Sequence, residues 1–186
     1  MKASPHPALQ AARRVCELLL RFYSSRMSAI SHLIVDGSNV LQAWPDTCAI
    51  ARSDREAART LLIRRMAGLH DGAGWRITVV FDGRGDALQF EPVGGAADFA
   101  CIYTPSGTTA DDIIEQLVAK SADPAACLVA TADQAERATV EAAGAAWCSP
   151  AELARRIEAQ ETRDGRALAR HGSATERAWR QKGGLA

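Results

Sequence analysis

The stretch from Leu33 to Asn39, which reads LIVDGSN, is the feature that most constrains how this chain can fold. A short apolar run that ends abruptly in a carboxylate, a glycine and polar residues is typical of a buried strand in a parallel sheet. In open α/β sheets, the residues that follow the carboxyl ends of the strands line the crevice where ligands bind. Asp36 is therefore either a turn residue or a reactive group, and the rest of the chain has to decide between the two.

Strand-like and helix-like segments alternate along the chain after this stretch. The apolar runs predict strands at about 32–36, 76–81, 99–103, 127–131 and 145–147. Helical periodicity and capping residues predict helices at about 54–70, 110–121, 133–143 and 150–160. This alternation predicts an α/β fold, in which a mostly parallel sheet of about five strands is covered by helices on both faces.

The connections between these elements carry weaker signals. A polar loop that contains Trp44 and Pro45 is expected after the first strand, and Ser53 is expected to cap the helix that follows it. Residues 84–98 mix glycine, proline and polar side chains without helical periodicity, and they are expected to form an irregular crossover. A short helix is expected near residues 174–181.

The 186 residues fit one domain with an extension at each end. We expect the domain over residues 27–160, after an N-terminal extension over 1–26 that is disordered or a loose amphipathic helix, upstream of a natural start at Met27. A basic tail follows over 161–186. The extension carries a net charge of +4, the domain −7 and the tail +3. Basic ends suit a polyanionic partner, and a simple solvated surface is an equally good interpretation.

Composition narrows the class of protein. No apolar run approaches the 18 or more residues that a membrane span needs, so no membrane partner is expected. The five cysteines are scattered and include no CxxC pair, which predicts thiols in a reducing compartment and a cytoplasmic protein. No P-loop or GxGxxG motif is present, which argues against a nucleotide-cofactor enzyme.

Aspartates follow four of the predicted strands or open the helices after them. In a parallel sheet the carboxyl ends of all strands lie along one edge, so we expect these carboxylates to converge there. The predicted metal-binding set is Asp36, Asp82, Asp111, Asp112 and Asp133, and the predicted catalytic set is Asp36, Asp111, Asp112 and Asp133. Carboxylates without histidine or cysteine suit a hard cation, Mg²⁺ or Mn²⁺.

Some of these aspartates also have an ordinary structural explanation. Asp112 follows Thr109 at the capping-box spacing, and Asp133 with Glu136 forms a plausible N-cap pair. Asp82 precedes a glycine, which is a common turn pair. Capping explains Asp112 or Asp133, but it does not explain why Asp111 stands beside Asp112.

Four residues near this edge are candidates for contacts with a phosphate chain. Ser38 and Asn39 can donate hydrogen bonds to a phosphate or to a metal-bound water, and Thr109 lies at a helix start, where anions bind readily. Arg84 can neutralise a phosphate, although a solvated loop arginine is an equal alternative. We expect these four to contact RNA.

Four motifs occur in the same order as in a known family: Ile34–Asn39, Val79–Asp82, Tyr103–Glu115 and Val129–Gln134. Together they resemble the YacP-like group of the NYN domain family, within the PIN-like superfamily. The resemblance implies a three-layer α/β/α fold and a divalent-metal-dependent ribonuclease with an acidic site. It also implies RNA turnover linked to translation, and hence a ribosome-associated substrate. Where the family often reads Ser-Asp after the fourth strand, this chain has Ala132-Asp133, so one hydroxyl is missing. Residues 1–26 and those after about 162 lie outside the resemblance.

The sequence therefore predicts an endoribonuclease in which a cation on these aspartates activates a water for in-line attack on an RNA phosphodiester. The main alternative is a non-cleaving RNA- or ribosome-binding module with the same fold. A phosphatase acting on small phosphoesters is a third possibility. The Asp-x-Asp pair of haloacid-dehalogenase-type enzymes is absent, because Ser38 stands two residues after Asp36.

Overall fold

A six-stranded sheet in the order β3-β4-β2-β1-β5-β6 forms the centre of the molecule. In the computed structural model, residues 32–182 are described, with side chains up to residue 167 apart from Arg84. The predicted N-terminal extension, residues 1–26, lies outside the described residues. The strands are β1 His32–Asp36, β2 Arg76–Gly85, β3 Gln89–Pro92, β4 Phe99–Pro105, β5 Cys127–Ala130 and β6 Ala146–Cys148.

Five of the six strands are parallel, which confirms the predicted α/β fold. The exception is β3, which pairs antiparallel with β4 at one edge of the sheet. The prediction of an irregular crossover over residues 84–98 was therefore wrong in part, and the sheet has one strand more than expected. Three of the four residues of β3 are exposed, so this edge strand lacks the apolar alternation that marks a strand in a sequence.

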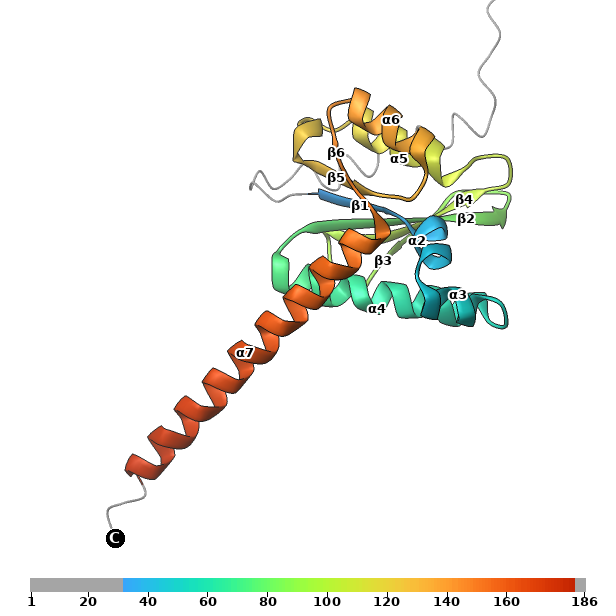
Figure 1. Ribbon diagram of the computed structural model, residues 1–186. Coiled ribbons are helices and arrows are strands. Elements are labelled where there is room, and N and C mark those ends of the chain that lie inside the picture. The colour runs from blue at the N-terminus through green and yellow to red at the C-terminus, as the bar shows by residue number, and fades with distance from the viewer. Residues whose placement is uncertain (1–31, 183–186) are drawn as a thin grey trace, which may run out of the picture.

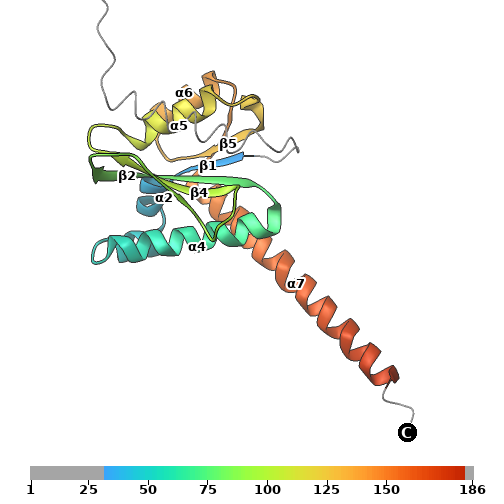
Figure 2. The same ribbon diagram turned by 180° about the vertical axis from the view of Figure 1, so that it is seen from behind.

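Helices cover both faces of the sheet. They are α2 Gly37–Ala43, α3 Pro45–Ala51, α4 Arg55–Ala73, α5 Ala110–Ala119, α6 Gln134–Ala142 and α7 Pro150–Lys182, with a 3₁₀ turn η1 at Pro124–Ala126. Helices α5 and α6 lie over one face, whereas α4 and the start of α7 lie over the other (Figures 1 and 2). Successive residues of β1 point to opposite faces, so Ile34 packs into the core under α5 while Leu33 and Val35 pack into the core under α4.

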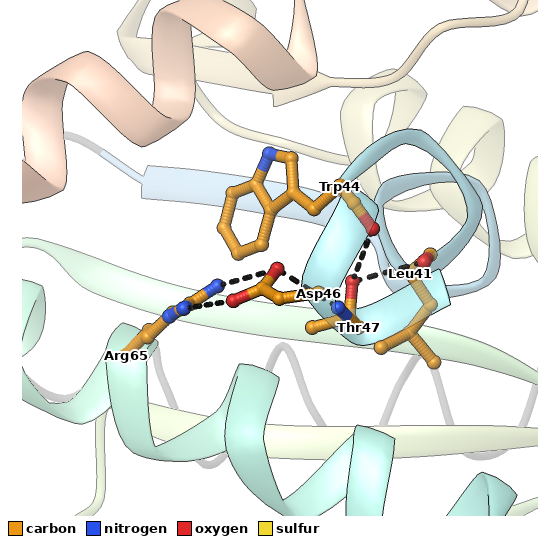
Figure 3. A network of polar contacts seen from close by, with 5 residues as sticks. All are labelled: Leu41, Trp44, Asp46, Thr47 and Arg65. Atoms are coloured by element: carbon orange, nitrogen blue, oxygen red, sulfur yellow. Dashed lines mark hydrogen bonds and ion pairs between the residues drawn. The ribbon is translucent and has the colours of Figure 1, made fainter. Parts of the chain in front are cut away.

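The segment after β1 is helical, whereas the sequence predicted a polar loop there. Two short helices meet at Trp44, and Pro45 takes the first position of α3, where its missing N–H is no loss. Figure 3 shows the contacts that hold this corner: the buried Thr47 hydroxyl donates to the carbonyl of Leu41 at 2.9 Å, and Arg65 of α4 pairs with Asp46. The Trp44 indole is 6% exposed, so this ring is part of the core.

The predicted helix after this corner is present as α4, but its cap differs from the prediction. Asp54, not Ser53, is the N-cap, and its carboxylate accepts the N–H of Ala57 at 2.9 Å. The Ser53 hydroxyl instead donates to the carbonyl of Ile50. Two adjacent residues that can both cap a helix are not distinguished by sequence alone.

Helix α7 continues from Pro150 to Lys182 as one element. Its first turns are anchored by Leu153 and Ile157, and the rest runs away from the body of the molecule (Figure 1). The prediction of a helix that stops near residue 160, with a separate short helix near 174–181, was therefore wrong. A polar stretch gives little sequence signal for a helix, but an anchored helix can propagate through it. No helix among residues 32–182 is long and apolar enough to cross a membrane.

Candidate metal centre

Three carboxylates meet at the carboxyl edge of the sheet. Asp36 ends β1, Asp111 lies in the first turn of α5 and Glu136 in the first turn of α6, and each offers an oxygen within 4.8 Å of the others. The chain leaves β1 to build β2 on one side, and later places β5 on the other side. The cluster therefore lies at the point where the strand order reverses, which is where open α/β sheets bind ligands.

Asp36 is buried at the centre of this edge, with 2% of its surface exposed. It is the N-cap of α2, and its Oδ1 accepts the backbone N–H of Asn39 at 2.9 Å. Burial raises the pKa of Asp36 to about 6, because the hydrogen bonds from Asn39 offset only part of the lost hydration, and the charges of Asp111 and Asp82 add to the rise. A cation at this position would favour the ionised form.

Glu136 is the member of the cluster that the sequence analysis did not identify. It is 2% exposed, and within the described structure neither of its carboxylate oxygens has a hydrogen-bond partner of good geometry. Burial raises its pKa to about 8, and the neighbouring Thr131 hydroxyl offsets only part of that shift. A carboxyl group buried in this way is either protonated and neutral, or ionised and paired with a cation. One sequence feature could have predicted its burial: Glu136 lies four residues before Val140, so the two side chains share the buried face of α6.

Asp111 is half-buried at the start of α5. Burial raises its pKa, and the negative charges of Asp133 and Asp82 raise it further. Asp111 therefore senses the charge of both aspartates that stand outside the three-carboxylate group. A cation among these carboxylates would offset their mutual repulsion.

Asp82 and Asp133 lie next to the cluster, and their own side chains are held by backbone groups. The Asp82 Oδ1 accepts the N–H of Ala110 at 2.9 Å, at the start of α5. Asp133 caps α6 by accepting the N–H of Ala135 at 2.6 Å and that of Glu136 at 3.3 Å. Both carboxylates thus fix the helices that carry Asp111 and Glu136, and both lie outside the group that shares one ligand position.

The structure does not bring Asp112 into the cluster. It forms a complete capping box with Thr109: the Thr109 hydroxyl accepts the Asp112 N–H at 3.2 Å, and the Asp112 carboxylate accepts the Thr109 N–H at 3.0 Å. Asp112 is also exposed. Of the two adjacent aspartates, Asp111 alone faces the other carboxylates.

The residues expected to contact RNA are placed as follows. The Ser38 hydroxyl accepts the N–H of Asp82 at 3.0 Å, which ties the start of α2 to β2. Asn39 binds Asp36, and Thr109 is the exposed N-cap of α5. The side chain of Arg84 lies outside the described residues. The first two therefore have a positioning role at the site, and their contacts with RNA stay a prediction.

The donor set fits a hard divalent cation. It consists of carboxylate oxygens alone, which suit Mg²⁺ or Mn²⁺ better than the softer metals that prefer histidine or cysteine. The strongest observation for this fit is that, among the described residues, neither oxygen of Glu136 has a hydrogen-bond partner of good geometry beyond the partial effect of Thr131, since a cation would satisfy them. The buried Asp/Asp/Glu cluster can therefore hold a metal ion.

Comparisons with known proteins identify the family of the chain. The sequence model of the family described as "YacP-like NYN domain" matches residues 33–182. The Bacillus subtilis (strain 168) protein named "Uncharacterized protein YacP" is 34% identical over 133 residues, which is 70% of this chain and 77% of that protein. The match to the family extends to residue 182, past residue 162, where the resemblance in the sequence was expected to end.

Solved structures give the same result. The crystal structure of Rae1 (YacP) from Bacillus subtilis is similar with a TM-score of 0.66 and 31% identity, over 80% of this chain and 86% of that one. The structure of a point mutant of the same protein gives a TM-score of 0.65 and 32% identity, over 77% of this chain and 85% of that one. At this identity the likeness covers sequence as well as fold.

Proposed function

The chain belongs to the YacP-like NYN domain family, which is a PIN-like nuclease family, and on this basis we propose that it is a divalent-metal-dependent endoribonuclease. The observation that carries the proposal is the group of Asp36, Asp111 and Glu136, whose oxygens lie within 4.8 Å of one another. A nucleic-acid substrate follows from the family. The choice of RNA, of internal cleavage and of translation-associated transcripts rests on the resemblance in the motifs, and we place the activity in the cytoplasm.

In this proposal Asp36, Asp111 and Glu136 hold the cation. When bound, Mg²⁺ or Mn²⁺ supplies Lewis-acid stabilisation of a phosphodiester and lowers the pKa of a coordinated water. The chain's own contribution is to keep three carboxylates fixed at the ends of β1, α5 and α6. Asp36 is held by the N–H of Asn39, and one of its oxygens lies within 4.8 Å of the ligand atoms of Asp111 and Glu136.

The remaining acids act on the charge and orientation of this group. Asp82 anchors the start of α5, and hence Asp111, through the N–H of Ala110. Asp133 anchors the start of α6, and hence Glu136, through its N-cap bonds. The negative charges of Asp82 and Asp133 raise the pKa of Asp111, and the same charges attract a cation to the site. We assign Asp82 and Asp133 as positioning residues and Asp112 as a structural cap.

The test is cleavage of a labelled single-stranded RNA by the purified protein, with Mn²⁺, Mg²⁺ or EDTA. We expect metal-dependent cutting in the wild type, and a loss of more than about tenfold for Asp36→Asn and Glu136→Gln, because even residues that only orient metal ligands are worth about 10- to 100-fold. Glu141→Gln is the matched control, since it removes the same charge from an exposed position of α6.

Two results would overturn the proposal. Cutting that is equal in EDTA, or that survives in both site variants, would place the activity elsewhere or in a contaminant. RNA that is bound with similar affinity by wild type and variants but never cut would favour the non-cleaving RNA-binding module. The orphaned buried carboxylate of Glu136 argues against that module, because RNA binding alone gains nothing from it.

A further inference from the structure

A pocket of about 460 Å³ lies beside the carboxylate cluster, and Asp82 forms part of its wall. The residues that define its chemistry are Arg55, Arg59, Asp82, Gln89, Tyr103 and Thr104. They come from α4, β2, β3 and β4, so the pocket lies toward the β3 edge of the sheet. Its volume falls in the range of sites that hold a ligand of nucleotide size.

Two arginines from successive turns of α4 give this pocket its positive charge. Arg59 is fixed: its Nη2 donates to the carbonyl of Asp82 at 3.0 Å, and its guanidinium lies 5.3 Å from the ring centre of Phe81 and 5.2 Å from that of Tyr103. Arg55 is exposed, and among the described residues its side chain makes no ion pair or hydrogen bond. Arg59 also pairs with the exposed Glu56 at 3.3 Å, so the pocket offers one anchored and partly neutralised cation and one cation that is free to bind an anion.

The positive charge of the two arginines can offset the repulsion between the acidic cluster and the phosphates of a nucleic acid. A phosphodiester chain that reaches Asp36, Asp111 and Glu136 meets negative charge, and its neighbouring phosphates gain nothing from the cluster. Arg55 and Arg59 line the same pocket as Asp82, whose charge acts on Asp36 and Asp111, and phosphate contacts from arginine position a nucleic acid on a protein.

We infer that this pocket binds the nucleotide adjacent to the cleaved linkage, with its phosphate on Arg55 and Arg59. The inference rests on the proposed ribonuclease function and names the subsite that holds its substrate in register. Gln89 and the hydroxyl of Tyr103 line the same wall and can hydrogen-bond a ribose or a base edge, whereas the buried Thr104 hydroxyl accepts the N–H of Gly83 at 3.2 Å. Burial raises the pKa of Tyr103 to about 12, so its hydroxyl keeps the proton that it would donate.

The experiment scans a short single-stranded RNA of defined sequence, in which one linkage at a time is a neutral methylphosphonate. Binding is measured with Asp36→Asn protein, so that cleavage is slowed, alone and with Arg55→Gln or Arg64→Gln added. Arg64 is the matched control, because it is an exposed arginine on α4 that does not line the pocket. Cleavage by the wild type marks the cut linkage on the same RNA.

We expect Arg55→Gln to weaken binding about fivefold, as for an exposed charge pair, and to lower the salt dependence by roughly one phosphate contact. Neutralising one linkage next to the cut should weaken binding by a similar factor, and combining it with Arg55→Gln should cause no further loss. Arg64→Gln should leave the affinity within twofold of its parent.

Additive losses at every linkage, or an Arg55→Gln affinity equal to that of Arg64→Gln, would overturn the pocket while leaving the nuclease intact. Coupling at a single linkage in a protein that never cuts RNA would support the pocket and refute the proposed function. No binding of RNA by any of these proteins would overturn both.

Discussion

Two neighbouring aspartates at the start of α5 point in different directions and have different roles. Asp112 forms both halves of a capping box with Thr109, whereas Asp111 faces Asp36 and Glu136. The difference follows from the helix, because consecutive side chains are about 100° apart and cannot share a face. One aspartate therefore stabilises the helix, and the other is free to take part in the site.

This separation predicts different losses for the two aspartates. Asp111→Asn should lower metal affinity and RNA cleavage by more than about tenfold, with little loss of stability. Asp112→Ala should leave the cleavage rate per folded molecule within about twofold and cost about 1 kcal/mol of unfolding free energy, because a cap is lost. Cleavage assays and urea denaturation of both variants measure this. A cleavage defect in Asp112→Ala as large as that in Asp111→Asn would contradict the assignment.

At the scale of elements, His70 links the end of α4 to the start of β4. Its Nε2 lies 2.9 Å from the Asp98 carboxylate, its Nδ1 lies 3.1 Å from that of Asp71, and its ring stacks on Phe99 at 5.5 Å. Burial lowers the pKa of His70, but the hydrogen bonds and charges of the two aspartates outweigh burial and raise it overall. The protonated ring also suits the negative end of the helix dipole.

This contact predicts a pH-dependent contribution to stability. Because the folded-state pKa is raised above 6.5, the stabilisation is fully present below about pH 6.5 and is lost as the pH rises through the folded-state pKa. His70→Gln should therefore destabilise the protein more at pH 5.5 than at pH 8.5, by about 0.5–1 kcal/mol, since both aspartates are partly exposed.

The measurement is the difference in unfolding free energy between wild type and His70→Gln at each pH, so that other titrating groups cancel. Asp98→Asn is a second variant that should show the same dependence, since it removes the less exposed of the two carboxylates. A difference that is constant from pH 5.5 to 8.5 would show that His70 contributes by packing on Phe99 alone.

At the scale of the whole molecule, the carboxylate cluster links the stability of the fold to pH. The pKa of Asp36 is raised from 3.8 to about 6, and that of Glu136 from 4.5 to about 8. Without a cation, the folded protein therefore holds protons that the unfolded chain releases. The contribution of these two groups to stability falls as the pH rises from about 4 to 8, because the unfolded chain gains ionisation that the folded site resists, and it outweighs the opposite contribution of the buried His32, whose pKa is lowered to about 3.

A divalent cation should reverse this trend, because it binds the ionised carboxylates. In EDTA we expect the melting temperature to fall between pH 5 and pH 8, corresponding to a few kcal/mol. Added Mn²⁺ should raise the melting temperature, and by more at pH 8 than at pH 5. Thermal unfolding monitored by circular dichroism measures both effects.

The Glu136→Gln variant distinguishes the contribution of the carboxylate cluster to the pH and Mn²⁺ dependence from that of the rest of the molecule. The variant should be more stable than wild type in EDTA at pH 8, less sensitive to pH, and less stabilised by Mn²⁺, while Glu141→Gln should behave as wild type. A shift with Mn²⁺ that is the same at pH 5 and pH 8 would mean that the ion binds elsewhere.

Local sequence patterns predicted much of the fold. The apolar runs around Ile34, Val80, Ile102 and Val129 identified the parallel strands, and the predicted family was confirmed. The same patterns placed Asp36, Asp82, Asp111 and Asp133 at one edge, because parallel strands present their carboxyl ends together. The edge strand β3, the two helices of residues 37–51 and the length of α7 were missed, since none of them carries a clear apolar period.

The tertiary structure decided which of these acids share one position. Strand order places β1 between β2 and β5, and this brings α5 and α6 over the end of β1. Glu136 thereby becomes a buried member of the cluster, while Asp112 is left outside it as a cap. A one-dimensional pattern specifies which face of an element is buried, but not which element covers it. That choice depends on contacts between residues distant in sequence, and so the composition of the site was settled only by the folded chain.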